Sequence, residues 1–199
     1  KTLEKRSIES KSILPISGFM NQNSFFSSPF IRINEQDSDY MHQAMSLYDS
    51  LNVKNKDLNT LYRLSEIKFK ALNDLDGAFN NYTQINNMTG DKYLKSETIL
   101  RIADILIAKG KLDDALEFIS KEIESPEWWK PDEKNRLKIK ENQILFYKSE
   151  LNLVYDNLNL ILKEYNIQEY DYNDILDIMN VILIIKDDEN IFKNILKLN

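Results

Sequence analysis

One pair of positions recurs along the chain, a small or β-branched residue followed four positions later by a large apolar one. Helical spacing places positions i and i+4 on one face, so the recurrence predicts helices that offer the same pair to their neighbours. The first members of successive pairs are separated by 34, 37, 39 and 37 residues. The pairs are Ala44 with Tyr48, Ala78 with Tyr82, Ala115 with Ile119, Val154 with Leu158 and Ile191 with Ile195.

The stretch 101–118 indicates how the helices are connected. Its apolar residues follow helical spacing, stop at the sequence KGKLDD and resume from Ala115. Gly110 is typical of a helix end, and Asp113 with Asp114 places negative charge at the start of the next helix. We therefore predict two helices folded into a hairpin with Gly110 in the turn, rather than one long helix.

Composition agrees with a helical protein. The 199 residues are 42% hydrophobic and 29% charged, with only four glycines and four prolines, which is too few for the turns of an all-β chain. The net charge of −6 argues against a nucleic-acid partner, and no apolar run is long enough to span a bilayer. We expect an all-α, soluble protein that does not insert into membranes, and composition leaves the oligomeric state open.

The chain begins at Lys1 rather than Met, which suits either a removed leader or a removed preceding domain. The absence of cysteine does not fix the compartment. The cytoplasm and, after removal of a leader, a bacterial periplasm or envelope both stay open.

The stretch 99–123 carries a family resemblance. Ala103, Gly110 and Ala115 stand where the tetratricopeptide repeat (TPR) family favours small residues and a turn glycine. The chain resembles this family, and the resemblance implies a right-handed α-solenoid of antiparallel helix hairpins, a TPR-like superhelix. The stretch 61–85 also matches but needs one extra residue before its turn. From residue 135 onward the pattern departs, because no turn glycine remains.

Two segments follow from this alignment. Residues 1–37 hold two prolines and no sustained helical period, so we expect an extended or looped segment. Its apolar side chains Phe25, Phe26, Phe30 and Ile31 predict a cap over the exposed end of the stack, and the alternative is that the chain was cut from a longer solenoid. Residues 38–199 are predicted to form the TPR-like domain, with approximate repeats 38–52 (a half repeat), 58–89, 95–126, 132–165 and 172–199.

The resemblance also implies a function. In this family the first helix of each hairpin lines a concave groove, which suits an extended or helical peptide. The corresponding residues here are Tyr62, Glu66, Phe69, Lys70, Leu100, Asp104, Ile107, Ile139, Gln143, Phe146 and Tyr147. The alternative is that some of these side chains bridge adjacent repeats. The family's clamp for a terminal carboxylate is not carried over, because Tyr62, Glu66, Leu100 and Asp104 replace its Lys and Asn residues.

Trp128 and Trp129 lie in the longest predicted loop between repeats. Either one indole plugs the core between repeats while the other lies on the surface, or the two form an exposed anchor for a partner protein.

Residues suited to catalysis are sparse. His42 is the only histidine, there is no cysteine, and no nucleophilic triad can be assembled. The sequence NDLDGA resembles a calcium loop, but Leu72 and Thr83 occupy the positions where the first and last ligands are needed. We predict no enzymatic activity, no cofactor and no metal.

The expected function is a scaffold or adaptor that binds a protein or peptide. The alternative is a helical accessory or structural domain, or a subunit, of a larger enzyme or of an envelope assembly complex. A helical-repeat RNA binder is disfavoured by the negative charge.

Overall fold

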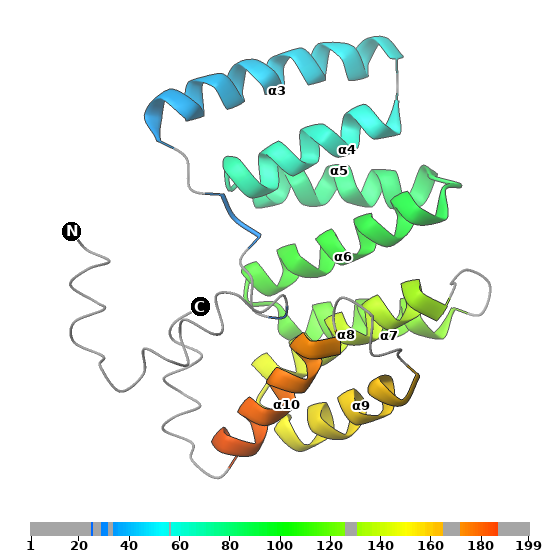
Figure 1. Ribbon diagram of the computed structural model, residues 1–199. Coiled ribbons are helices and arrows are strands. Elements are labelled where there is room, and N and C mark those ends of the chain that lie inside the picture. Colours follow the sequence, from blue (N-terminus) through cyan, green and yellow to red (C-terminus); the bar gives the residue numbers. More distant parts are fainter. Residues whose placement is uncertain are drawn as a thin grey trace. The chain divides into compact units, whose positions relative to one another are not determined.

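The structure, a computed structural model, describes residues 25, 29–31, 34–55, 57–125, 131–164 and 172–186. Within these residues the regular structure is helical and includes no strand, so the predicted all-α class is confirmed (Figure 1). None of the helices described there is long and apolar enough to cross a membrane. Trp128, Trp129 and the last predicted pair, Ile191 with Ile195, lie outside the described residues.

The helices follow one another in the order of the chain (Figure 1). Their bounds are α3 Glu35–Asn55, α4 Leu58–Glu66, the π-helical turn η1 Ile67–Ala71, α5 Leu75–Met88, α6 Lys92–Ala108, α7 Leu112–Glu124, α8 Pro131–Tyr147, α9 Leu151–Glu164 and α10 Tyr172–Ile185.

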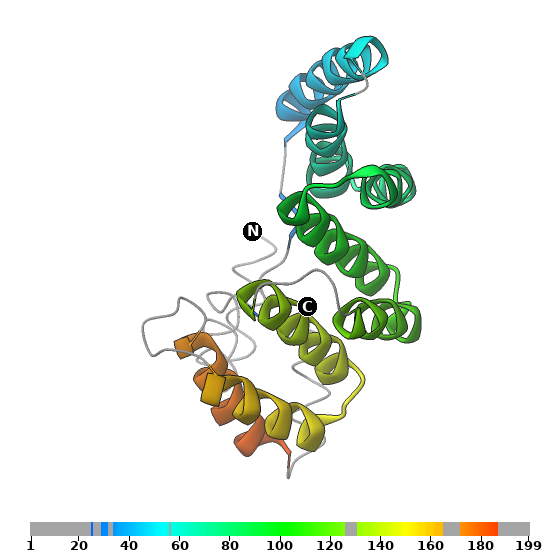
Figure 2. The same cartoon turned by 90° about the vertical axis from the view of Figure 1, so that its right-hand side faces the viewer.

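The chain divides into two compact units. One is Pro29–Glu141, and the other combines Lys1–Ser28 with Asn142–Asn199, so the division falls inside α8. In the first unit each helix from α3 to α7 packs against the next one in the chain (Figure 1 and Figure 2). In the second unit α9 packs against α10.

The helix α3 begins at Glu35, three residues before the predicted boundary between residues 37 and 38. The side chain of Asn34 explains the difference, because its Oδ1 accepts a hydrogen bond from the backbone N–H of Asp37 at 2.8 Å. The expected extended segment 1–37 is therefore corrected at its end, where residues 35–37 are helical.

Three hairpin turns contain a residue in the left-handed conformation. These residues are Asn73 (φ 54°), Gly110 (φ 71°) and Ser149 (φ 69°). Each lies five positions before the first member of the next recurring pair, which is Ala78, Ala115 or Val154 respectively. The predicted turn at Gly110 is confirmed, and α6 and α7 are separate helices. Ser149 takes the same role between α8 and α9 without being glycine.

The turns at Gly110 and Ser149 close with the same hydrogen bonds. The N–H of Lys111 donates to the carbonyl of Leu106 at 2.9 Å, and the N–H of Glu150 donates to the carbonyl of Leu145 at 3.0 Å. Each bond reaches five residues back and satisfies a carbonyl that the helix end leaves open. Two hairpins with different turn residues therefore share one backbone geometry.

The hairpin of α4 and α5 differs from these by one inserted residue. The N–H of Leu72 donates to the carbonyl of Ile67 at 3.1 Å, which is the five-residue spacing of a π turn. The closing bond, from the N–H of Asp74 to the carbonyl of Lys68 at 2.8 Å, reaches six residues back. The extra residue that the sequence alignment requires before this turn is thus accommodated inside η1.

The recurring pairs form the core of the hairpins. Three pairs have no exposed surface on either member, namely Ala78 with Tyr82, Ala115 with Ile119, and Val154 with Leu158. On α3, Ala44 and Tyr48 are half-buried. A small first member lets the two helices of a hairpin approach closely, and the larger second member fills the space beside it.

Replacing Ala115 by Leu should lower the free energy of unfolding by about 1–3 kcal/mol, because the larger side chain overpacks a fully buried position. Gly110→Asn should cost less, since a Cβ at Gly110 meets no atom within 4 Å and Asn tolerates the left-handed conformation. Urea unfolding of the two variants measures both effects. A larger loss for Gly110→Asn than for Ala115→Leu would contradict the assigned turn and core positions.

Candidate interaction surface on the first helices

The eleven residues predicted to line a groove all lie within the described part of α4, η1, α6 and α8. Phe69, Leu100, Gln143 and Phe146 are buried. The half-buried ones are Tyr62, Glu66, Lys70, Asp104, Ile107, Ile139 and Tyr147. Many of these side chains are therefore engaged with neighbouring residues rather than open.

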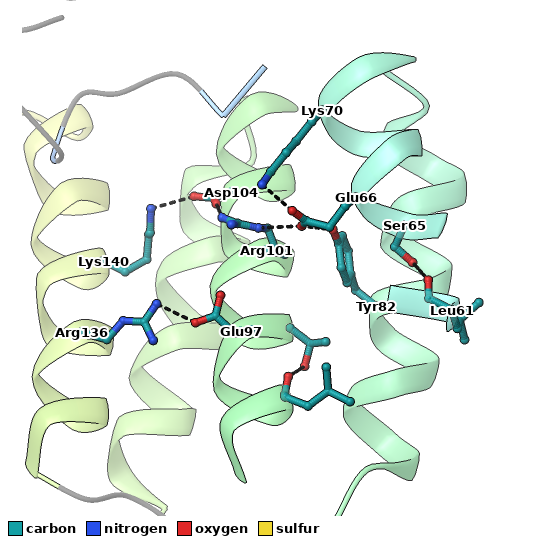
Figure 3. Close-up of polar contacts among 12 residues, drawn as sticks. Leu61, Ser65, Glu66, Lys70, Tyr82, Glu97, Arg101, Asp104, Arg136 and Lys140 are labelled. Atoms are coloured by element: carbon teal, nitrogen blue, oxygen red, sulfur yellow. Dashed lines mark hydrogen bonds and ion pairs between the residues drawn. The ribbon is translucent and has the colours of Figure 1, made fainter. Parts of the chain in front are cut away.

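Glu66, at the end of α4, is the centre of a polar cluster in the unit Pro29–Glu141 (Figure 3). Its Oε1 accepts hydrogen bonds from Arg101 Nε at 2.9 Å and from the hydroxyl of Tyr82 at 2.5 Å. Its Oε2 pairs with Lys70 Nζ. One carboxylate thus joins α4, η1, α5 and α6.

The cluster continues from α6 to the first part of α8 (Figure 3). Arg101 Nη1 donates to Asp104 Oδ2 at 3.0 Å, and Lys140 Nζ donates to Asp104 Oδ1 at 2.7 Å. A second link joins Arg136 Nη2 to Glu97 Oε1 at 2.7 Å. We call the row Glu66, Arg101, Asp104 and Lys140 the polar row. The sequence left open whether some of the predicted groove residues bridge adjacent repeats instead of facing a partner. In the polar row, Glu66 and Asp104 do bridge adjacent hairpins.

The electrostatic environment fixes the charges of this cluster. Burial by itself raises the pKa of Glu66, but the charge of Arg101 and the hydrogen bonds from Lys70 and Tyr82 outweigh burial and hold that pKa below its usual value. Burial and the Glu66 charge raise the pKa of Tyr62 to about 12. They also raise the pKa of Tyr82 well above its usual value. At neutral pH the carboxyl group is charged and both phenols are neutral.

A hollow of about 340 Å³ lies beside the cluster in the same unit. It is lined by Asn59, Tyr62, Arg63, Glu66, Asp91, Tyr93, Leu94 and Glu97. Two phenols, three carboxylates and one guanidinium contribute to this lining, so the hollow suits a polar group more than an apolar one. Its volume is at the lower end of the range for small-ligand sites.

A short stretch of the chain's N-terminal part lies against η1. The N–H of Ile31 donates to the carbonyl of Lys70 at 2.8 Å. The ring of Phe30 meets the buried ring of Phe69 edge to face, with 5.3 Å between centroids and 67° between planes. Residues 29–31 have no helical structure. These two contacts resemble those of a bound peptide, with one main-chain hydrogen bond and one aromatic contact.

A comparable contact occurs in the other unit. The carbonyl of Phe25 accepts a hydrogen bond from Gln143 Nε2 at 2.5 Å. The Phe25 ring lies edge to face with Phe146, at 6.0 Å and 84°. Thus Gln143 and Phe146, two residues predicted to face a partner, contact the chain's own N-terminal part. Tyr147 lies beside Phe146, with 6.3 Å between the ring centroids. The N-terminal apolar residues were predicted to form a cap. Of these residues, Phe30 and Ile31 contact η1 and Phe25 contacts α8, whereas Phe26 lies outside the described residues.

Sequence reasoning missed the cationic half of the polar row, Arg101 and Lys140. A signal for it was present, because Arg101 follows Glu66 by 35 residues and Lys140 follows Asp104 by 36. Opposite charges about one repeat apart on successive first helices can meet across hairpins. Arg136 and Glu97 form a pair of the same kind, 39 residues apart by subtraction.

Comparison of the chain with family models, with curated proteins and with solved structures gave no match. The TPR resemblance therefore stays a prediction from the sequence.

Among the residues that the structure describes, no three His, Cys, Asp or Glu side chains are grouped to hold a metal ion. His42 lies exposed on α3. The NDLDGA sequence spans the end of the turn and the first residues of α5, and Asp74 Oδ1 accepts a hydrogen bond from the N–H of Gly77 at 2.9 Å.

Replacing Glu66 by Gln should lower the free energy of unfolding by about 1–3 kcal/mol at pH 7, because Arg101 and Lys70 lose a largely buried charged partner. Folding favours the charged carboxyl, so its contribution is complete above the usual pKa of 4.5 and is lost as pH falls through the lower folded-state pKa. The difference between the wild type and Glu66→Gln should therefore shrink below pH 4.5. Urea unfolding at a series of pH values measures it.

Asp114→Asn is the matched control for this prediction. It removes the ion pair with Lys111, whose two side chains are 62% and 57% exposed, so we expect little change in stability. Equal losses in the two variants, or a Glu66→Gln effect that does not vary with pH, would contradict the assigned role of Glu66.

Proposed function

We propose that the chain is a TPR-like, right-handed solenoid and acts as a protein-protein interaction scaffold that binds a partner protein or peptide on the face of its first helices. The observation that carries this proposal is the contact of residues 29–31 with η1. There the N–H of Ile31 and the ring of Phe30 make the two kinds of contact that an extended peptide offers. A face that accepts its own chain in this way suits a foreign peptide of the same kind.

The geometry of the hairpins supports the solenoid part of this proposal. Three turns place a left-handed residue five positions before a buried small or β-branched residue. From α3 to α7 each helix packs against its chain neighbour. Repetition of one turn and packing between neighbours are the features by which solenoids are built.

The polar row and the hollow beside it support selective binding. The row alternates negative and positive charges across three successive first helices. The hollow adds Tyr93 and Asp91, which are exposed, next to the half-buried Tyr62. A peptide that follows this face would meet fixed charges in a fixed order, which favours one sequence over others.

One observation favours the alternative, a helical accessory or structural domain, or a subunit, of a larger enzyme or an envelope assembly complex. On α3 the side chains of Tyr40 and Leu47 are 58% and 61% exposed. Apolar surface on the first described helix is what a neighbouring domain would cover.

Affinity purification with mass spectrometry tests the scaffold function. The proteins recovered with the wild type are compared with those recovered with the variant Ile107→Glu. Ile107 is half-buried on α6, on the predicted binding face. We expect a partner recovered with the wild type to be reduced at least about tenfold by the new charge, which corresponds to about 1.4 kcal/mol of binding free energy.

Leu116→Glu is the matched control, because Leu116 is also half-buried but lies on the second helix of that hairpin, α7. It should leave recovery of the partner unchanged, and circular dichroism should show the helical content of the wild type in both variants. Recovery lost equally in both variants, or no protein above background with the wild type, would contradict the scaffold function. A partner held through α3 instead, and lost on Tyr40→Glu alone, would favour the accessory-domain alternative.

A further inference from the structure

The last turn of η1 offers a backbone carbonyl to another segment of the chain. In an α-helix the N–H of residue 74 would bond to the carbonyl of Lys70, but here the N–H of Asp74 reaches back to Lys68. The carbonyl of Lys70 instead accepts the N–H of Ile31, which comes from outside the helix. A carbonyl that the helix end leaves open therefore binds the backbone of another segment.

An aromatic contact stands next to this acceptor. Phe69 precedes Lys70 on η1 and has no exposed surface, so its position is fixed by the core. Phe30 precedes Ile31 and packs its ring on Phe69, yet 38% of Phe30 remains exposed and 55% of Ile31 does. The pair Phe30 and Ile31 thus lies on the surface of the fold, as a ligand does, and is not part of its core.

We propose that η1, through the Lys70 carbonyl and the Phe69 ring, is a docking site for an extended peptide that carries an aromatic residue followed by an apolar one, and that the chain's own Phe30 and Ile31 occupy it as an intramolecular competitor. This inference rests on the proposed scaffold function and names the class of its partner. The aromatic side chain supplies the anchor, and the N–H of the following residue supplies the hydrogen bond. Residues 29–31 and η1 belong to the same unit, Pro29–Glu141.

The competition has a predictable size. Only three residues separate Ile31 from the start of α3, so its effective concentration at η1 is on the order of mM. A segment that occupies the site nine-tenths of the time weakens a competing peptide about tenfold. A partner must therefore either bind more tightly than this segment or make further contacts elsewhere on the face.

The test is a fluorescence anisotropy titration of the full chain into a labelled peptide of sequence SPFIRIN, which corresponds to residues 28–34. Phe30→Ala in the chain removes the aromatic anchor of the competitor and should raise the affinity for this peptide at least about tenfold over the wild type. The same peptide with its Phe replaced by Ala should bind neither protein. A peptide whose Ile nitrogen, at the position of residue 31, is methylated should lose most of its affinity, because the donor to Lys70 is gone.

Tyr40→Ala is the control variant, since Tyr40 is an exposed aromatic residue on α3, and it should bind the peptide as weakly as the wild type. If Phe30→Ala lowers the melting temperature strongly, Ile31→Pro, which removes the competitor's donor and keeps Phe30, replaces it with the same expectation. Equal affinities of wild type and variant for the peptide, or no binding to a folded variant, would overturn the proposal. The proposal would also be overturned if the wild type formed a dimer and the site opened only when the dimer dissociated. That result would show that a second copy of the chain occupies the site.

The outcome is separable from that of the proposed function. A partner lost on Ile107→Glu together with no gain in peptide affinity on Phe30→Ala would overturn the docking site at η1 and leave the scaffold function standing. A gain in peptide affinity without any recovered partner would support the docking site and contradict only the broader function.

Discussion

The close approach of the two helices within each hairpin is the contact on which the rest of the described structure depends. One position of the second helix carries a small or β-branched side chain, and Ala78, Ala115 and Val154 have no exposed surface there. Each follows a left-handed turn residue by five positions, so the turn fixes which face of the second helix meets the first. The first helix also contacts the next hairpin, where Arg101 meets Glu66 and Lys140 meets Asp104.

The polar row has a consequence for how this face can bind. Charged groups that are largely buried are costly unless each has a partner, and here Arg101 lies between Glu66 and Asp104 while Lys140 pairs with Asp104. Because these charges already satisfy one another, a ligand gains little net free energy by replacing their partners. Affinity on this face must come mainly from main-chain hydrogen bonds and apolar anchors. The polar row contributes selectivity, because its charges have fixed positions along the face.

The sequence predicted the features that depend on residue type at a fixed spacing, such as the turn at Gly110 and the buried Ala115. It could not predict that Ser149 takes the left-handed conformation, because a serine there is acceptable only when the packing of both helices imposes it. The alignment showed that one extra residue precedes Asn73. It could not show where this residue goes, because a longer loop and a π turn each accommodate one additional residue. The charges of the polar row were also visible, and only the register between hairpins, which tertiary packing sets, brings Arg101 to Glu66.

The π turn links the fold to its proposed use. An inserted residue in a helix disturbs the regular hydrogen bonds and would be expected in a loop, where it costs less. At the end of η1 the carbonyl of Lys70, which the helix end leaves open, receives the N–H of Ile31 beside the buried ring of Phe69. A partly exposed residue such as Phe30 adds modest stability by packing there, so the arrangement can be exchanged for a similar peptide at small cost. The same local irregularity that weakens the repeat pattern is thus the part of the face best suited to bind a partner.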